Sequence, residues 1–290
     1  MPKNAKDIIQ FTQLGSWGRF GNQLFEYAFL KICAELNNLE IQTPSWVGNY
    51  LFDIHDPPPT AKLPAYEEKW DAKTQYPILP DLSICKNIDY QGFAQFHTSF
   101  FRPHKELIKK VFQVTPPLIE KLGERNQFST TRIGIHLRRG DYGRSIFYIT
   151  PVAWYLDWLA KWWGEFHNPI LYIATESVEL VKEFAAYNPI TAEDLGVDYF
   201  HEDLHDPRQL DFFSEWYYLT QCDVIVAPNS TFSFTAAMLS PCMQRFFRSN
   251  LATQQIEEED VWDAYPLQRL DQKDFPNVPG AWVKKTKYWG

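Results

Sequence analysis

The sequence predicts an α/β protein of two domains, and three observations lead to this class. The chain has 290 residues, enough for two modest domains that each bury a core. In its second half, short apolar runs alternate with longer amphipathic ones, a pattern typical of a parallel sheet with helices between its strands. A polar stretch at residues 115–129 separates the halves. We therefore expect an N-terminal domain over residues 1–128 and a C-terminal domain over residues 129–290.

The first half begins with a predicted strand over residues 8–14, a glycine-rich turn over residues 15–23 and a helix. The helix is predicted because apolar residues share one face at a period of 3.6, namely Leu24, Phe25, Ala28, Ile32, Cys33 and Leu36. The glycine-rich turn has two interpretations. It either binds an anion or a sugar at the helix start, or needs glycine only for positive φ angles. Its G-x-x-G-x-x-G spacing is not the dinucleotide-binding one, so no NAD site is predicted.

The next segment is harder to interpret, because prolines recur through residues 40–82. They predict an irregular excursion that covers one edge of the first domain. A strand and a loop are expected over residues 89–101, and a helix over residues 103–112. The polar residues 115–129 are expected to form only a connection.

The second half alternates regularly. Ile133, Ile135 and Leu137 alternate with Gly134 and His136, which predicts a strand. Helices are expected over residues 151–166, 177–187, 209–221 and 231–239, and strands over residues 170–175, at residues 199–200 and over residues 224–227. The acidic run at residues 257–260 is expected to be a solvated face.

Two arginines directly follow the predicted strand that ends at Leu137. Arg138 and Arg139 thus belong to the carboxyl edge of a sheet, where open α/β folds bind ligands. A guanidinium group matches phosphate oxygens in shape, and each such bond contributes about 1.5–3 kcal/mol. A solvated loop is the alternative, but His136 and Asp141 flank the pair in an otherwise acidic chain, which favours a phosphate site.

A second polar cluster follows the strand predicted over residues 224–227. It consists of Asn229, Ser230, Thr231 and Ser233. Hydroxyl groups at a helix start are ordinary caps, and any one of these residues can be explained in that way. Together with free backbone N–H groups they could also hold a phosphate.

Composition narrows the class of protein. The net charge of −8 argues against nucleic acid as a partner. The sequence contains no run of about 18 apolar residues, so no membrane span is predicted. The first ten residues are polar and lack the apolar core of a signal peptide. We therefore expect a cytoplasmic protein. Cys33, Cys85, Cys222 and Cys242 are scattered and are expected to be reduced thiols. The 17% aromatic content is compatible with a carbohydrate site or with an aromatic core.

Three stretches resemble peptides of the α-1,2-fucosyltransferase family. Residues 133–142, I-G-I-H-L-R-R-G-D-Y, are similar to its H-x-R-R-G-D-Y motif. Residues 18–28, G-R-F-G-N-Q-L-F-E-Y-A, are similar to its G-x-x-G-N-Q-x-F-x-Y-A peptide. The stretch from Glu215 to Phe234 and the next residue resemble D-x-x-L-M-x-x-C-x-x-x-I-I-A-N-S-T-F-S-W-W, with departures at Glu215, at Pro228, and at Phe234 and Thr235, which replace the paired Trp. The α-1,6- and protein O-fucosyltransferases carry related peptides.

The resemblance implies a GT-B-like fold, in which two Rossmann-like domains face a cleft. It implies an inverting transfer of L-fucose from GDP-fucose to a hydroxyl group, with O2 of a terminal β-galactoside as the expected acceptor. The N-terminal domain would then lie on the acceptor side, and the C-terminal domain would bind the GDP-sugar. No metal or other cofactor is expected, and no D-x-D sequence is present.

The resemblance also assigns roles to residues. Arg138 would stabilise charge on the β-phosphate, and Asp141 would either act as the acceptor base or hold an arginine in position. Glu215 would accept hydrogen bonds from the guanine edge in place of the family's aspartate. The expected donor-binding residues are Arg19, Asn22, His136, Arg139, Glu215, Asn229, Ser230, Thr231 and Ser233.

Two alternatives stay open. The first is a protein O-fucosyltransferase or a transferase of another GDP-linked sugar. The second is a non-catalytic protein that binds a sugar nucleotide or a glycan, which the departures at Glu215, Phe234 and Thr235 keep possible.

Overall fold

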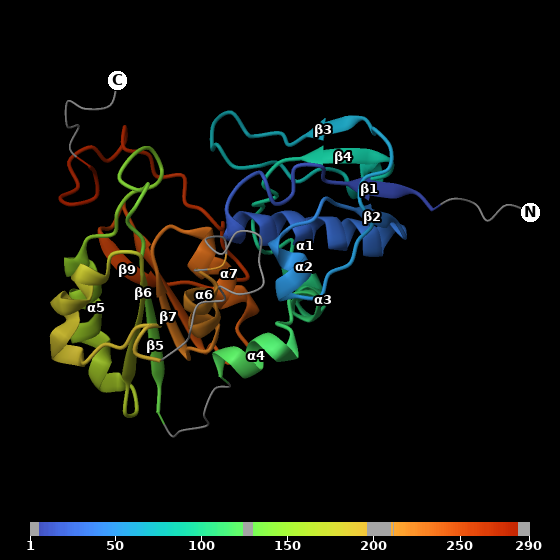
Figure 1. The fold of residues 1–290 in the computed structure, drawn as a ribbon. Coiled ribbons are helices and arrows are strands. Elements are labelled where there is room, and N and C mark those ends of the chain that lie inside the picture. Colours follow the sequence, from blue (N-terminus) through green and yellow to red (C-terminus); the bar gives the residue numbers. More distant parts are fainter. Residues whose placement is uncertain (1–5, 124–129, 196–209, 211, 284–290) are drawn as a thin grey trace, which may run out of the picture. The chain divides into compact units, whose positions relative to one another are not determined.

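The structure, a computed structural model, describes residues 6–123, 130–195, 210 and 212–283, and the chain divides into two compact units (Figure 1). Unit 1 comprises Met1–Lys121 and Trp262–Pro266, and unit 2 comprises Leu122–Val261 and Leu267–Gly290. The units therefore separate near the end of helix α4 (Pro116–Leu122). The boundary predicted between residues 128 and 129 falls within residues 124–129, which lie outside the described residues.

Unit 1 contains a four-stranded sheet in which every pairing is parallel, in the order β2-β1-β4-β3. Its strands are β1 (Ile8–Gln10), β2 (Glu40–Gln42), β3 (Ala65–Glu67) and β4 (Ile88–Gln91). The first strand is shorter than predicted. The prediction that residues 40–82 are irregular was only partly correct, because three short elements, β2, β3 and helix α2 (Val47–Leu51), interrupt the irregular segments. Three-residue strands are too short to show a period.

Helix α1 (Phe20–Asn37) follows β1 and confirms the predicted helix. It ends at Asn38, which has the left-handed conformation that often closes a helix, with φ 53°. The helix is buried on more than the predicted face, since Gln23 and Glu26 are buried as well. Leu36, expected in the core, is instead 54% exposed near the helix end.

The rest of unit 1 is helical and largely as expected. The predicted helix over residues 103–112 appears as a 3-10 turn, η2 (Arg102–His104), followed by α3 (Lys105–Val111). A short 3-10 turn, η1 (Leu82–Ile84), precedes β4. The connection predicted at residues 115–129 contains a helix, α4, because Leu118 and Leu122 lie four residues apart and are both buried.

Unit 2 contains a five-stranded sheet in the order β6-β5-β7-β8-β9, parallel except for β9. Its strands are β5 (Arg132–Leu137), β6 (Ile170–Thr175), β7 (Val224–Ala227), β8 (Arg245–Asn250) and β9 (Gln255–Glu258). The first three were predicted, and β8 and β9 were not. The acidic run is not simply solvated, because Glu258 pairs with Arg245 and Glu259 with the buried Arg248.

Helices flank this sheet, with α5 on one side and α6 and α7 on the other (Figure 1). The helical segments are α5 (Val152–Trp162), η3 (Trp163–Glu165), η4 (Val178–Tyr187), α6 (Phe213–Thr220) and α7 (Thr231–Leu239). The helix predicted over residues 177–187 is present as a 3-10 helix. The strand end predicted at residues 199–200 lies outside the described residues.

Strand β5 sends alternate side chains to opposite faces. Ile133, Ile135 and Leu137 pack in a core with Tyr155 and Leu159 of α5. Gly134 faces the other layer, where an added Cβ would lie 2.7 Å from the Cys222 sulfur atom. A glycine is therefore required for the chain around α6 to approach β5.

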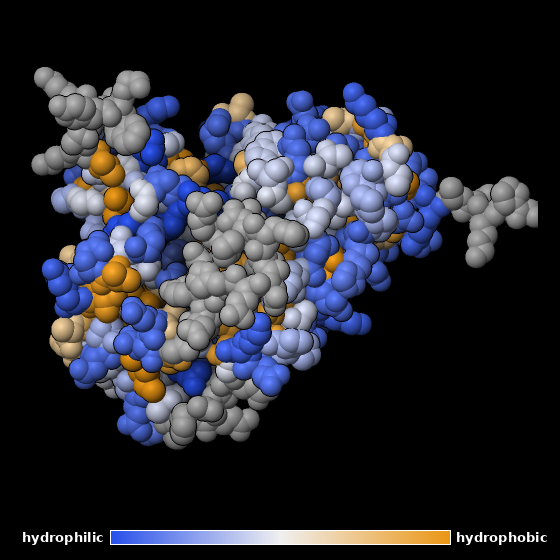
Figure 2. Space-filling view, in the orientation of Figure 1, coloured by the Kyte–Doolittle hydropathy of each residue, from blue (hydrophilic) through white to orange (hydrophobic). Residues whose placement is uncertain are grey.

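The α/β class with parallel sheets is confirmed. No described helix is long and apolar enough to cross a membrane. Figure 2 shows a mainly hydrophilic face with apolar residues scattered over it, as is ordinary for a folded domain. All four cysteines are free, as predicted, and the Cys33 and Cys85 sulfur atoms lie 3.2 Å apart inside unit 1.

Candidate active site

The sheet of unit 2 reverses its winding direction at β5. The chain passes from β5 to β6 on one side, then returns to β7 on the other side of β5. In open α/β sheets, ligands bind at the carboxyl ends of the strands where this reversal occurs. The segments that leave this edge are the arginine loop, residues 138–142, and the residues 228–231 that lead into α7.

A carboxylate that the sequence did not identify holds the arginine loop. Glu176 Oε1 accepts hydrogen bonds from Arg138 Nη1 and from the backbone N–H of Arg139, each at 2.9 Å. Arg138 Nη2 also donates to Asp141 Oδ1 at 2.5 Å. The Arg138 guanidinium is thus fixed between two carboxylates. Glu176 could have been found, because it directly follows the strand predicted next to β5.

Asp141 and Arg139 also support the loop. The Asp141 side chain is 48% exposed, and its contact with Arg138 favours the anchoring role over that of a base. Arg139 Nη1 donates to the Arg138 carbonyl oxygen at 2.9 Å. The Arg138 guanidinium also lies over the Tyr142 ring, whose hydroxyl group donates to the Asn229 carbonyl oxygen. The two segments at this edge are therefore joined directly.

His136 lies beneath the edge and is buried. Its Nδ1 is 2.9 Å from Ser233 Oγ, so strand β5 and helix α7 are linked by a side-chain hydrogen bond. Burial, helped by the positive charges of Arg138 and Arg139, lowers the pKa of His136 to about 3. The imidazole is therefore neutral at physiological pH and adds no positive charge.

The residues after β7 mainly build the framework. Both amide hydrogens of Asn229 are used, since Nδ2 donates to the carbonyl oxygens of Ile146 and Gln268. We infer that Asn229 shapes the site rather than binding a ligand through that amide. Ser230 is the N-cap of α7 and accepts from Phe232 N at 3.4 Å, which agrees with the capping interpretation. Thr231 begins the helix and is nearly buried.

Glu215 reaches the same edge from helix α6. Its Oε1 accepts the backbone N–H of Thr175, the last residue of β6, at 3.1 Å. Burial raises the pKa of Glu215 to about 7; the Thr175 N–H and the Arg138 charge oppose this rise, and Glu176 adds to it. The carboxyl group therefore changes its charge near neutral pH.

Arg19 and Asn22 belong to unit 1. Arg19 is the exposed N-cap of α1, and Asn22 Oδ1 accepts from Gln95 Nε2 at 2.9 Å. Gly15 and Gly18 have φ angles of 84° and 70°, so the turn does need glycine, as one of the two interpretations held. A role for Arg19 and Asn22 in donor binding stays a prediction.

The edge in unit 2 is chemically suited to an anion. It combines two guanidinium groups, the start of helix α7 and a neutral histidine, and Asp141 and Glu176 fix the Arg138 guanidinium. Across the described ranges, no group of three or more His, Cys, Asp or Glu side chains could hold a metal ion. The predicted site residues of unit 2 are thus gathered at one edge, and Glu176, Thr175 and Tyr142 join them.

Comparisons with known proteins point to one enzyme class. The family model described as glycosyl transferase family 11 matches residues 1–243. Human galactoside alpha-(1,2)-fucosyltransferase 1 is 25% identical over 262 residues, covering 78% of this chain. The protein of that name from Lagothrix lagotricha is 24% identical over 270 residues, covering 82% of this chain and 68% of its own length. The chain spans only 66% of the length of the human relative.

Solved structures share the fold. The α-1,6-fucosyltransferase NodZ soaked with GDP-fucose aligns with a TM-score of 0.52 at 14% identity, over 88% of this chain and 99% of NodZ. NodZ from Bradyrhizobium aligns with a TM-score of 0.54 at 11% identity, over 89% of this chain and 100% of NodZ. A variant of Arabidopsis thaliana FUT1 in complex with GDP also aligns with a TM-score of 0.54 at 11% identity, over 89% of this chain and 75% of the FUT1 chain. The expected GT-B-like fold class is confirmed.

Proposed function

Because the chain belongs to glycosyl transferase family 11, we propose that it transfers L-fucose from GDP-fucose to a hydroxyl group of a glycan. The observation that carries the proposal is the arginine loop at the carboxyl edge of β5, where Glu176 accepts hydrogen bonds from the Arg138 guanidinium and from the Arg139 backbone N–H. A diphosphate is the anionic part of GDP-fucose, and two guanidinium groups match it in charge and in hydrogen-bonding geometry.

The reaction requires stabilisation of a leaving group. The acceptor hydroxyl attacks the anomeric carbon of fucose, and the bond from that carbon to the β-phosphate oxygen breaks. The electron pair leaves with GDP, and inversion follows from in-line attack. Negative charge therefore grows on the β-phosphate, where we assign Arg138, with Arg139 supporting the loop. A preorganised cation at such a position commonly supplies the largest single part of catalysis.

The hydroxyl proton must pass to a base, for which a carboxylate is suited. Asp141 was the candidate from sequence, but its hydrogen bond to Arg138 gives it a second role. The role of Asp141 as the base stays a prediction. The variant described in the Discussion distinguishes this role from anchoring of Arg138.

We assign recognition of the guanine base to Glu215. Its position beside Thr175 puts a carboxylate at the carboxyl end of β6, which supports this assignment because a carboxylate can accept hydrogen bonds from the two N–H groups of a guanine base. Binding requires the ionised form of the carboxyl group, and burial raises the pKa of Glu215 to about 7.

The acceptor proposed is O2 of a terminal β-galactoside, supported by similarity to the galactoside alpha-(1,2)-fucosyltransferases. Independence from metal ions and a cytoplasmic location stay predictions. A protein O-fucosyltransferase activity would appear as transfer to a peptide, and a non-catalytic protein would bind GDP-fucose without releasing GDP.

The decisive experiment is calorimetric titration of GDP, with UDP as its control, in excess EDTA. The proposal predicts metal-free binding of GDP and much weaker binding of UDP. Release of GDP from GDP-fucose is then measured with lactose and with peptide acceptors. Equal binding of UDP, or a requirement for a divalent ion, would contradict the assigned donor site. If GDP release did not depend on any acceptor, the chain would instead be a non-catalytic protein that binds the sugar nucleotide.

A further inference from the structure

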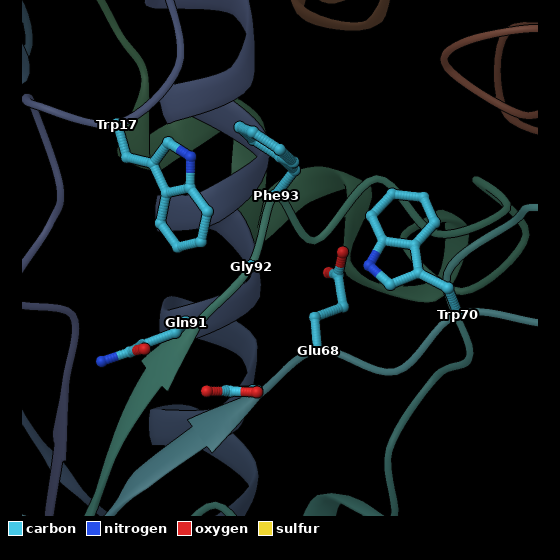
Figure 3. A pocket seen from close by; sticks show the side chains of 7 residues that line it. Trp17, Glu68, Trp70, Gln91, Gly92 and Phe93 are labelled. Carbon is cyan, nitrogen blue, oxygen red and sulfur yellow. The ribbon is translucent and has the colours of Figure 1, made fainter.

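Unit 1 contains a hollow of about 230 Å³ beside the ends of strands β3 and β4 (Figure 3). The side chains that line it are Trp17, Glu67, Glu68, Trp70, Gln91 and Phe93. They come from three segments, namely the glycine-rich turn before α1, the end of β3 and the end of β4. No site described above includes this hollow.

Parallel pairing of β3 and β4 builds its floor. Glu67 lies opposite Gln91 in the register, and the backbone N–H of Glu68 donates to the Gln91 carbonyl oxygen. Gly92 permits this close approach, because an added Cβ would lie 2.3 Å from the Glu68 Cβ. A glycine at position 92 is therefore needed for the hollow to have this shape.

The Glu68 side chain is fixed in place. Its Oε2 accepts from the Tyr90 hydroxyl group and from the backbone N–H of Ala94, each at 2.7 Å. Ala94 has a φ of 50°, a conformation that a residue with a Cβ adopts only when its surroundings hold it. The hollow is thus rigid before any ligand arrives, which reduces the entropic cost of binding.

Aromatic rings form its sides. Trp17 and Trp70 are 37% and 38% exposed, and Figure 3 shows them on opposite sides of the hollow, with the Glu68 carboxylate between Phe93 and Trp70. The Trp17 and Phe93 ring centroids lie 5.3 Å apart, so these two rings support each other. Indole faces left partly open to water can pack against the C–H face of a sugar ring and bury apolar surface on both sides.

The charge of the lining excludes a phosphate ligand. It contains two carboxylates and one amide, and no lysine, arginine or histidine belongs to it. Carboxylates repel a phosphate but accept hydrogen bonds from hydroxyl groups, and the Gln91 amide can both donate and accept. A ligand here is therefore neutral and rich in hydroxyl groups, unlike the anion suited to the arginine loop.

The volume limits the size of the ligand. Sites for drug-sized molecules measure roughly 300–1,000 Å³. At about 230 Å³, this hollow suits one ring rather than a nucleotide. An exposed hollow also lets the rest of a longer glycan remain in solvent.

We propose that this hollow binds a single pyranose ring of the acceptor glycan, stacked on Trp17 or Trp70 and hydrogen-bonded to Glu67 and Gln91. Only the identification of the sugar as the acceptor rests on the proposed function. Binding of a neutral sugar by the hollow does not depend on it.

The test uses the full chain and two independent measurements. Saturation-transfer NMR with methyl β-galactoside, β-glucoside, α-mannoside and N-acetyl-β-glucosaminide reports sugar binding without catalysis. Initial rates with lactose and GDP-fucose report the two KM values. The variants are Trp17→Ala, Trp70→Ala and the conservative Trp70→Phe, and the control is Leu36→Ala, which removes an exposed apolar side chain from α1 outside the hollow.

We expect each Trp→Ala variant to lose NMR saturation of the preferred glycoside and to raise the KM for lactose about tenfold, the scale of one lost stacking contact. Trp70→Phe should restore most of the affinity. The KM for GDP-fucose and the affinity for GDP should stay within about twofold of the wild type, which also shows that the variants fold.

The outcomes separate the two proposals. Saturation that depends on Trp70, in a protein that transfers no fucose, would support the sugar site and contradict the transferase function. Normal transfer with an unchanged KM for lactose in both Trp→Ala variants would overturn the identification of the sugar as the acceptor, whereas unchanged saturation in both variants would overturn the sugar site itself. Absence of saturation with all four glycosides in the wild type would also overturn it.

Discussion

Arg138 and Glu176 form an ion pair at the carboxyl edge of unit 2, with 2.9 Å between Nη1 and Oε1. The same Glu176 oxygen accepts the Arg139 backbone N–H, so one carboxylate orients both the side chain and the loop that carries it. Such a contact between partly exposed groups adds little to stability. Its importance lies in positioning, because the guanidinium is already oriented before the donor binds.

Glu176→Ala should therefore lower kcat/KM for GDP-fucose by about 10- to 100-fold, the effect of a misplaced catalytic group. If Glu176 acts through Arg138, the double variant Glu176→Ala/Arg138→Ala should be no slower than Arg138→Ala alone. Initial-rate kinetics of the four proteins measure this coupling. Additive losses would mean that Glu176 has a role independent of Arg138.

Arg138→Ala should reduce kcat by roughly 10²–10³, as expected when one preorganised charge stabiliser is removed. The matched control is Lys182→Ala, which removes the same charge from an exposed position in η4. The measurement is GDP release at saturating GDP-fucose and acceptor. A kcat within about threefold of the wild type would remove Arg138 from the proposed mechanism.

Much of the unit 2 sheet could be predicted, because β5 and β6 are six-residue strands, the first with alternating and the second with mostly apolar residues, and a helix lies between them in sequence. The three-residue strands β2 and β3 could not, since so few residues show no period and prolines surround them. Strand β9 was hidden by its acidic side chains; Glu258 on the strand and Glu259 directly after it pair with Arg245 and Arg248 on β8. Pairing partners distant in sequence leave no local signal.

The same limit applies to the sites. Arg138 and His136 were recognisable because they adjoin a strong strand pattern in one continuous motif. The amide of Asn229 belongs to the same kind of motif, yet its use in holding Ile146 and Gln268 depends on contacts far along the chain. The hollow in unit 1 combines three separate segments, and nothing in the spacing of Trp17 and Trp70 predicts that they line one space.

Asp141→Asn distinguishes the two roles of Asp141. The contact with Arg138 leads us to expect anchoring, so the variant should weaken GDP binding about tenfold and lower the rate by a similar factor. Calorimetry with GDP and initial rates are compared in the same buffer. Complete loss of turnover with unchanged GDP affinity would instead identify Asp141 as the base.

Glu215 predicts a pH dependence of GDP binding. Its pKa is raised to about 7, and only the carboxylate can accept both guanine N–H groups. Affinity should therefore fall as the pH drops from 8 to 6, approaching tenfold per pH unit well below the pKa. Glu215→Gln should bind more weakly at pH 8 but with a smaller pH dependence. The GDP phosphate titrates equally in both proteins, so an unchanged slope in the variant would refute the assignment to guanine.

Glu26 predicts a pH dependence of stability in unit 1. It is fully buried on α1, neither carboxyl oxygen has a hydrogen-bond partner among the described residues, and burial with the nearby Glu68 raises its pKa from 4.5 to about 9. Between these two values the unfolded chain releases the proton whereas the folded protein retains it. Stability contributed by this group is therefore complete below pH 4.5 and is lost progressively as the pH rises to about 9.

Glu26→Gln removes this titration, because glutamine has a similar shape and no charge. The melting temperature of the variant should rise relative to the wild type as the pH increases from 5 to 9, and the difference should be smallest at pH 5. Scanning calorimetry at several pH values measures it. The control is Glu35→Gln, which makes the same substitution at an exposed position on the same helix. A difference for Glu26→Gln that stays constant across this range would show that the buried carboxyl group is not held neutral by the fold.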